Sequence, residues 1–176
     1  GTVTSPAEFM MVCAMNPCKC GWYGDPSGRC QCSEAAVHAY QSRISGPMLD
    51  RIDIVVEVTS VQYEDLRTRA EGEPSSAIKQ RVDDARSIQN QRFGVSSGMC
   101  NARMGPGEMR LYCALDDEAE ALMKLAFESM GLTARSYDRI IRVARTVADL
   151  DGSPEIQAQH IAEAIQYRSV EIGSRW

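Results

Sequence analysis

Only two stretches of this 176-residue chain have the composition of β-strands, and both lie in its first third. Residues 9–15 form a continuous apolar run that ends at the turn signal Asn16-Pro17, as a buried strand of a parallel sheet would. Residues 52–58 are rich in β-branched side chains and predict a second strand. Because two strands do not make a stable sheet alone, either further strands precede this chain in a longer protein or these two pack on helices.

Short helices are expected around the two strands. Ser33 predicts a cap for a helix over residues 34–40. Pro47 suits the first turn of a short helix that runs through Arg51. Residues 62–69 predict one more short helix.

From residue 75 onward the periodicity is helical, because apolar residues recur at intervals of three to four. The expected inward positions are Ile78, Val82, Ala85 and Ile88; Ala121, Leu122, Leu125 and Ala126 after a cap at Asp116 or Asp117; Tyr137, Ile140, Ile141, Ala144, Val147 and Ala148 after a cap at Thr133; and Ile161, Ala164 and Ile165 after Pro154. Residues 93–107 predict an irregular connection. The expected organisation is an α/β part with one or two strands at residues 1–70, then an all-α bundle at residues 71–176, joined at Glu71-Gly72-Glu73-Pro74-Ser75.

The net charge of −5 argues against nucleic-acid binding by bulk charge alone, although a local basic patch remains compatible with it. No apolar run reaches the length of a membrane span. The first residues lack the basic and apolar regions of a secretory signal. We therefore expect a cytoplasmic protein without a membrane partner.

Four of the seven cysteines lie within fifteen residues, in the pattern Cys18-Lys19-Cys20 and Cys30-Gln31-Cys32. Four thiolates suit the tetrahedral coordination that Zn²⁺ prefers, and a clustered quartet in a cytosolic chain more often indicates metal than disulfides. The C-x-C spacing is tighter than the usual C-x-x-C. Four reduced cysteines, or two disulfides formed on oxidation, are the alternatives to structural zinc.

Three segments together resemble a known family. Ala14–Gly21 reads A-M-N-P-C-K-C-G, Ser42–Asp53 reads S-R-I-S-G-P-M-L-D-R-I-D, and Leu132–Leu150 follows as an arginine-rich helix. In this order they resemble signature stretches of the magnesium-chelatase-like AAA+ ATPases, most closely the ComM-type (YifB-type) branch. The resemblance covers essentially the whole chain. It implies the C-terminal part of an AAA+ α/β core, including the cysteine loop at residues 18–32, followed by the helical lid.

The resemblance also implies roles for three polar residues. Asn16 would be sensor 1, which holds the attacking water or the γ-phosphate; a turn-capping Asn before Pro17 is the alternative. Arg51 would be an arginine finger for ATP bound by a neighbouring subunit. An ion pair of Arg51 with Asp50 or Asp53 is the competing interpretation.

The third residue is Arg135, and the other arginines are weaker candidates. Arg135 resembles sensor 2, which contacts phosphate from the start of the lid helix, and Arg43 is a lesser candidate for the finger. Arg139, Arg142 and Arg145 continue at helical spacing, and they form either a solvated basic face or a contact with nucleotide or DNA.

Two motifs are missing from the sequence. It has no G-x-x-x-x-G-K-[ST] loop and no apolar strand ending in an Asp-Glu pair, so we predict no ATP hydrolysis by this chain alone. The resemblance implies that the full-length protein binds ATP and Mg²⁺, forms a ring of identical subunits and acts on DNA as an ATP-driven helicase for branch migration in natural transformation. The alternatives are the ATPase subunit of a magnesium chelatase, which is not expected to carry the C-x-C pairs, and a non-enzymatic zinc-stapled interaction module.

Overall fold

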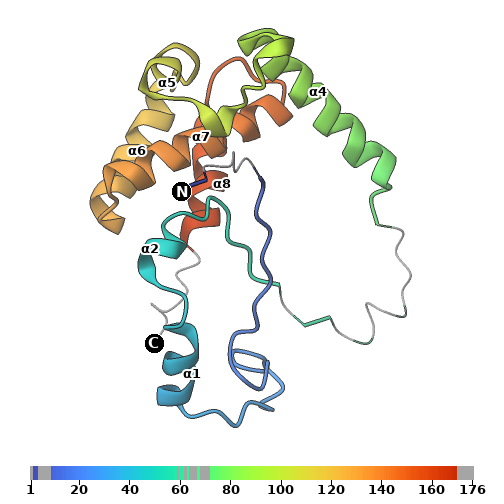
Figure 1. The fold of residues 1–176 in the computed structure, drawn as a ribbon, viewed down its shortest axis with the longest axis vertical. Helices are drawn as coiled ribbons and strands as arrows, with labels where there is room; N and C mark the ends of the chain where they lie inside the picture. The colour runs from blue at the N-terminus through green and yellow to red at the C-terminus, as the bar shows by residue number, and fades with distance from the viewer. Residues whose placement is uncertain are drawn as a thin grey trace. The chain divides into compact units, whose positions relative to one another are not determined.

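The computed structural model describes residues 2–3, 9–58, 60–61, 63, 67 and 72–169. The chain divides into two compact units, one of residues 1–44 with 172–176 and one of residues 45–171. Figure 1 shows the helices of both units along the chain. Within the described residues, no helix is both long enough and apolar enough to cross a membrane.

In its described residues the first unit contains the cysteine loop and one helix, α1 (Glu34–Gln41). The prediction of this helix is confirmed, and Ser33 caps it, because the Ser33 side chain accepts a hydrogen bond from the N–H of Ala36. Gln41 at the end of α1 donates to the carbonyl oxygen of Pro17 at 3.0 Å. This contact ties the helix to the start of the loop.

The two predicted strands are not formed among the described residues. Residues 9–16 and 52–58 are extended but unpaired, and apolar side chains such as Phe9 and Val58 are exposed. A strand is stable only when a neighbour accepts its backbone hydrogen bonds and a face is covered. In the described part of the chain the backbone pairing outside helices is limited to an isolated parallel bridge between Leu115 and Ile156 and to single contacts such as Val55 N–H to Tyr167 O.

The second unit is helical. It comprises α2 (Gly46–Leu49), α4 (Ser75–Phe93), the 3₁₀ turns η1 (Val95–Ser97) and η2 (Asn101–Arg103), α5 (Pro106–Tyr112), α6 (Asp117–Met130), α7 (Ala134–Leu150) and α8 (Ala158–Ser169). The predicted helix over residues 62–69 lies largely outside the described residues. The irregular connection expected at residues 93–107 is present, interrupted by the two 3₁₀ turns.

Local sequence explains the ends of α6 and α7. The Asp116 carboxylate accepts from the N–H of Ala119 at 2.7 Å, and the Thr133 hydroxyl accepts from the N–H of Ser136 at 3.2 Å. Both predicted caps are therefore confirmed. Gly131 ends α6 with φ 60°, a left-handed conformation in which glycine carries no Cβ penalty.

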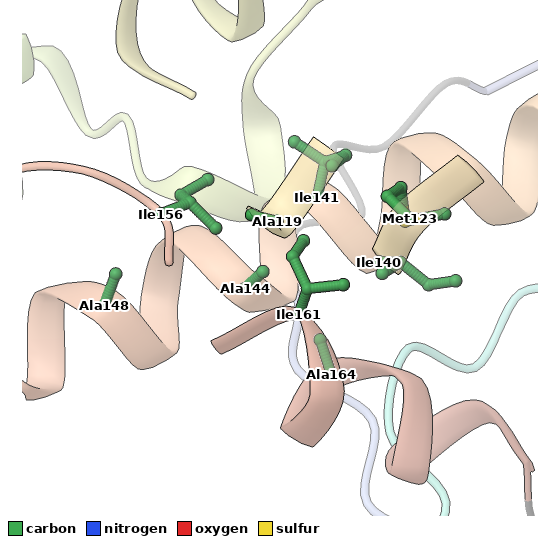
Figure 2. Close-up of a cluster of buried hydrophobic side chains, with 9 residues drawn as sticks. All are labelled: Ala119, Met123, Ile140, Ile141, Ala144, Ala148, Ile156, Ile161 and Ala164. Carbon is green, nitrogen blue, oxygen red and sulfur yellow. The ribbon is translucent and has the colours of Figure 1, made fainter. Parts of the chain in front are cut away.

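The core of the second unit lies where α6, α7 and α8 meet. Figure 2 shows Ile161 and Ala164 of α8 facing side chains of α7, with Met123 and Ala119 of α6 beside them. Alanines at this junction allow close approach of the helix backbones. The buried cluster comprises Ala119, Met123, Ile140, Ile141, Ala144, Ala148, Ile156, Ile161 and Ala164.

The predicted inward faces of α4 and α6 are only partly right. On α4, Ala85 is buried, whereas Ile78 and Val82 are exposed. On α6, the core face is formed by Ala119, Met123 and Ala126, and Leu125 points to solvent. Helical spacing fixes which residues share a stripe, but the neighbouring helices decide which stripe is covered.

A buried polar network joins α4, η2 and α7. Asp149 of α7 accepts from Arg92 of α4 at 2.6 and 2.8 Å, from Asn101 at 2.7 Å and from Arg145 at 3.0 Å. Arg145 also donates to the backbone carbonyls of Ser153 and Pro154. The hydrogen bonds that Arg92 donates to Asp149 raise the pKa of Arg92, whereas burial lowers the pKa of Arg145. Every charge in the network has an opposite charge beside it, which makes its burial tolerable.

Candidate functional site

The sulfur atoms of Cys18, Cys20, Cys30 and Cys32 all lie within 4.8 Å of one another. Cys18 Sγ is 3.3 Å from Cys20 Sγ and 3.9 Å from Cys30 Sγ, and Cys20 Sγ is 3.6 Å from both Cys30 and Cys32. All four are free thiols. A Zn–S bond of about 2.3 Å implies sulfur atoms about 3.8 Å apart around a tetrahedral ion. The quartet therefore fits one Zn²⁺.

The loop between the two C-x-C pairs brings the cysteines together through a series of tight turns. Gly21 N–H donates to Cys18 O, Asp25 N–H to Trp22 O and Gly28 N–H to Asp25 O, at 3.1 to 3.3 Å. Gly21 has φ 82° and Gly28 has φ 68°, values that side chains with a Cβ rarely adopt. The glycines therefore let the chain reverse between the pairs.

The thiols of the quartet influence one another strongly. Hydrogen bonds from the Trp22 backbone and from the Cys18 thiol lower the pKa of Cys20 to about 6. The Cys32 backbone lowers the pKa of Cys30, but desolvation and the neighbouring thiols outweigh it and raise that pKa to about 11. Thiolates so close together repel one another, as expected for a site that a cation would complete.

Asn16 ends the extended segment that precedes the cysteine loop. It is exposed, and its side chain faces Gly21, because a Cβ placed on Gly21 would lie 3.9 Å from Asn16 Cγ. The extended segment is not paired as a strand, so the sheet edge at which Asn16 was expected is not formed among the described residues. Asn16 lies in the first unit, whereas Arg51 and Arg135 lie in the second.

Arg51 follows α2 and is exposed. Its guanidinium donates to the carbonyl oxygen of Pro47 at 3.0 Å. Within the described residues Arg51 pairs with no carboxylate, so the expected alternative, an ion pair with Asp50 or Asp53, is not what the structure contains. Arg43, the lesser finger candidate, lies in the first unit, with its guanidinium 6.0 Å from the centre of the Tyr40 ring.

The two carboxylates that flank Arg51 are engaged by the lid helix α7. Arg135 lies 3.1 Å from Asp50, and Arg139 lies 2.9 Å from Asp53. Arg135 is the exposed member of the arginine row, with 63% of its side chain accessible. The hydrogen bond from Arg135 lowers the pKa of Asp50, and its charge and those of Arg168 and Arg139 add to this effect against partial desolvation.

The interpretation of the remaining row as a solvated basic face is wrong. Arg139 is 16% accessible and paired with Asp53, and Arg145 is 1% accessible within the buried network. Arg142 is partly buried, and its Nε has no hydrogen-bond partner. The spacing placed these arginines on neighbouring turns of α7, but the structure turns Arg139 toward a carboxylate and Arg145 toward a carboxylate and backbone carbonyls of the second unit.

Sequence reasoning missed one residue of this cluster, Arg168 of α8. It donates to the carbonyl oxygen of Ile52 at 2.9 Å and lies 3.4 Å from Asp50 and 3.3 Å from the Ser136 hydroxyl. Its distance of more than a hundred residues from Asp50 in sequence left no local signal. Arg168 is the one Arg or Lys in the sequence of α8, and this was the available hint.

Two arginines stack on aromatic rings in the first unit. The Arg29 guanidinium lies 4.7 Å from the centre of the Trp22 ring, and both residues are exposed in the cysteine loop. The second pair is Arg43 with Tyr40 on α1. Residues 9–44 contain three basic residues and two acidic ones: Lys19, Arg29 and Arg43 against Asp25 and Glu34. This unit is thus locally less acidic than the chain, whose net charge is −5.

Two family models match the chain. Residues 72–168 match the family described as magnesium chelatase, subunit ChlI C-terminal, and residues 1–66 match magnesium chelatase, subunit ChlI. The chain is 36% identical to the competence protein ComM of Haemophilus influenzae over 166 residues. These residues cover 94% of this chain and 31% of the relative. It is 36% identical over 170 residues to the uncharacterised protein YifB of Escherichia coli, covering 96% and 32%.

More distant relatives match in the same way. An uncharacterised protein of Mycobacterium bovis, Mb2921c, is 32% identical over 168 residues, which cover 96% of this chain and 33% of the relative. The chain thus spans about a third of the length of the curated relatives that it matches.

Proposed function

Because this chain belongs to the magnesium chelatase ChlI family of AAA+ proteins, we propose that it is the C-terminal part of a ring-forming, cytoplasmic ATPase of the ComM type. In this proposal residues 1–70 complete an α/β core and residues 71–176 form the helical lid. The extended segments 9–16 and 52–58 are strands that pair with strands from the rest of the longer protein. Their exposed apolar side chains support this, since a neighbouring strand and a covering helix would bury them.

The observation that carries the proposal is the state of Arg51. Its guanidinium is exposed and bonded to one backbone carbonyl, while the carboxylates on either side of it are occupied by arginines of α7. An arginine finger must be free to reach a neighbour's nucleotide and must not be neutralised by its own chain. We assign Arg51 this role, in which it stabilises the charge on the transferred phosphoryl group.

Two further residues complete the proposed nucleotide contacts. Asn16 acts as sensor 1 and orients the attacking water, and Arg135 acts as sensor 2 and contacts phosphate. With ATP and Mg²⁺ bound, transfer of the γ-phosphoryl group to water, with ADP as the leaving group, would drive the motor. The 176 residues contain no phosphate-binding loop, so the remaining contacts belong to the rest of the longer protein.

We propose that the cysteine quartet binds structural Zn²⁺ and that the loop it holds contacts DNA. The fit of the four sulfur atoms to a tetrahedron supports the metal. The exposed Trp22 with Arg29 stacked on it supports the DNA contact, because aromatic rings and guanidinium planes stack on bases without regard to sequence. The motor would then drive branch migration of DNA, the activity expected of a competence helicase.

A second candidate is the ATPase subunit of a magnesium chelatase, whose description both family models carry. The same finger and sensor roles would apply. The cysteine quartet favours the ComM-type function, because insertion of a metal into a porphyrin does not require a zinc-bound loop that contacts DNA.

The test uses the full-length protein that contains this chain. We expect ATP hydrolysis that forked DNA stimulates, and loss of hydrolysis in Arg51→Ala with ATP binding retained. Mixing Arg51→Ala subunits with subunits whose phosphate-binding lysine is replaced should restore part of the activity. The Arg51→Ala subunit keeps an intact nucleotide site, and the lysine variant beside it supplies the arginine finger. Arg43→Ala serves as the matched control and should leave the rate close to that of the unchanged protein.

The outcomes separate the two candidates. Hydrolysis that depends on Arg51 but does not respond to forked DNA, and responds instead to a porphyrin with magnesium, favours the chelatase. Hydrolysis that survives Arg51→Ala removes the finger assignment altogether.

A further inference from the structure

The segment that follows Arg51 lies against the last turn of α8. The N–H of Val55 donates to Tyr167 O at 3.0 Å. Carbonyls in the last turn of a helix have no partner within the helix, so they accept from donors outside it. Arg168, the next residue of α8, donates to Ile52 O at 2.9 Å. The end of α8 therefore holds the chain directly after Arg51.

The Arg168 guanidinium contacts the residues on both sides of Arg51. One terminal nitrogen donates to Ile52 O, and the other lies 3.4 Å from the Asp50 carboxylate. The second nitrogen also lies 3.3 Å from the hydroxyl of Ser136 in the first turn of α7. A guanidinium is planar, and its donors are fixed relative to one another. A single side chain therefore holds both neighbours of Arg51 in one geometry.

These contacts are sheltered from solvent. The Arg168 side chain is 14% accessible, and Ser136 is buried. By comparison, the side chain of Arg135, the other partner of Asp50, is 63% accessible. Exposed ion pairs do little to hold a chain in place, whereas sheltered hydrogen bonds from a charged group are stronger. Arg168 therefore contributes more to the attachment than Arg135 does.

Arg51 itself is held at its backbone while its side chain is exposed. Its N–H donates to Met48 O at 3.0 Å, and its guanidinium donates to Pro47 O at 3.0 Å. An arginine finger is effective when its charged end reaches the transferred phosphoryl group in the right orientation, because a misplacement of about 1 Å can cost a hundredfold in rate. The orientation of the backbone at Arg51 therefore matters for the proposed reaction.

We propose that Arg168 is a positioning residue, which fixes the backbone on both sides of Arg51 so that the finger is presented to the neighbouring subunit in one orientation. This inference rests on the proposed function of Arg51. Arg168 acts through the finger and has no contact with nucleotide. The segment does not move in this role, which is the same whether Arg135 stays on Asp50 or leaves it.

The first test replaces Arg168 in the full-length protein. In Arg168→Gln we expect kcat to fall about tenfold and KM for ATP to stay within about twofold, because a finger acts mainly in the transition state. Arg168→Lys keeps the charge but loses the planar fork, so its kcat should fall by a smaller factor. Arg81→Gln, which breaks an exposed pair with Glu73, is the matched control and should change neither constant. Gel filtration checks that the rings assemble, and Arg168→Lys supplies the same readouts if Arg168→Gln does not assemble.

Mixed rings show whether the defect lies in the finger. An Arg168→Gln subunit keeps its own nucleotide site, and a neighbour whose phosphate-binding lysine is replaced supplies an intact finger. The rate per Arg168→Gln subunit should therefore rise in the mixture toward that of the unchanged protein. A residue needed only for the folding of its own subunit would show no such gain.

The outcomes separate this inference from the proposed function. Hydrolysis that survives Arg51→Ala, or a full-length protein that hydrolyses no ATP, overturns both. Where Arg51→Ala abolishes hydrolysis, an unchanged kcat in Arg168→Gln or the absence of a gain in mixed rings overturns the inference alone and leaves the finger assignment standing.

Discussion

The guanidinium of Arg135 lies 3.1 Å from the carboxylate of Asp50, although 85 positions separate them in the chain. The pair connects the first residue after α2 with the first turn of α7. The family resemblance implies that one member of this pair, Arg135, is a phosphate sensor. Arg135 is therefore engaged by its own chain in this state, and in the proposed sensor role a phosphate would have to displace the Asp50 carboxylate from it.

The pair makes the stability of the second unit dependent on acid pH. Because Arg135 holds the pKa of Asp50 below its ordinary value of 3.8, Asp50 contributes stability above that pH and loses it as the pH falls through the lowered pKa. We expect the difference in unfolding free energy between the unchanged chain and Asp50→Asn to be present at pH 5 and to vanish in stronger acid. Urea unfolding followed by circular dichroism at several pH values measures it. A difference that stays constant with pH would contradict the assignment.

Removal of single cysteines should abolish stoichiometric metal binding. We expect about one zinc per chain in protein purified without chelator, and much less in Cys18→Ser or Cys30→Ser, because three thiolates leave the tetrahedron incomplete. Cys13→Ser is the matched control, since Cys13 lies in the same unit outside the quartet. Elemental analysis after gel filtration measures the zinc content per chain of each variant. Equal zinc in Cys13→Ser and Cys30→Ser would exclude the quartet as the site.

Asp149 should be the most sensitive polar position of the helical unit. Its replacement by alanine leaves Arg92 and Arg145 sheltered without a counter-charge, which costs about 3–5 kcal/mol for buried pairs. Glu73→Ala removes an exposed partner of Arg81 and should cost about 1 kcal/mol or less. Denaturant unfolding of both variants gives the comparison. A cost for Asp149→Ala as small as that for Glu73→Ala would mean that solvent reaches the network.

Sequence patterns predicted what local physics determines. The helix caps at Ser33, Asp116 and Thr133 depend on residues three positions away, and the structure contains all three. The clustering of the cysteines followed from their spacing in the chain. Such features need no knowledge of distant neighbours.

What sequence could not supply was the identity of distant partners. The strands expected at residues 9–15 and 52–58 depend on neighbours for their hydrogen bonds, and the described residues provide none that pair with them as strands. The partners of Asp50 and Asp53 come from α7 and α8, far along the chain. Ion pairs at such separation leave no periodic signal, so the local pairing with Arg51 looked equally suitable.

Trp22 should report directly on nucleic acid bound to the cysteine loop. In the 176-residue chain carrying Trp176→Phe, a single-stranded oligonucleotide that stacks on Trp22 would quench the remaining tryptophan fluorescence. Trp22→Ala should weaken binding by about 1 kcal/mol or more, as expected for loss of one stacking ring, whereas Trp22→Phe keeps an aromatic face and should lose less. Arg29→Ala should lower both the affinity and its dependence on salt, because one cation near the strand is removed. Fluorescence titration at several salt concentrations measures all three effects. Binding that Trp22→Ala leaves unchanged would mean that the indole only packs beside the cysteine quartet, and the proposed DNA contact of this loop would be excluded.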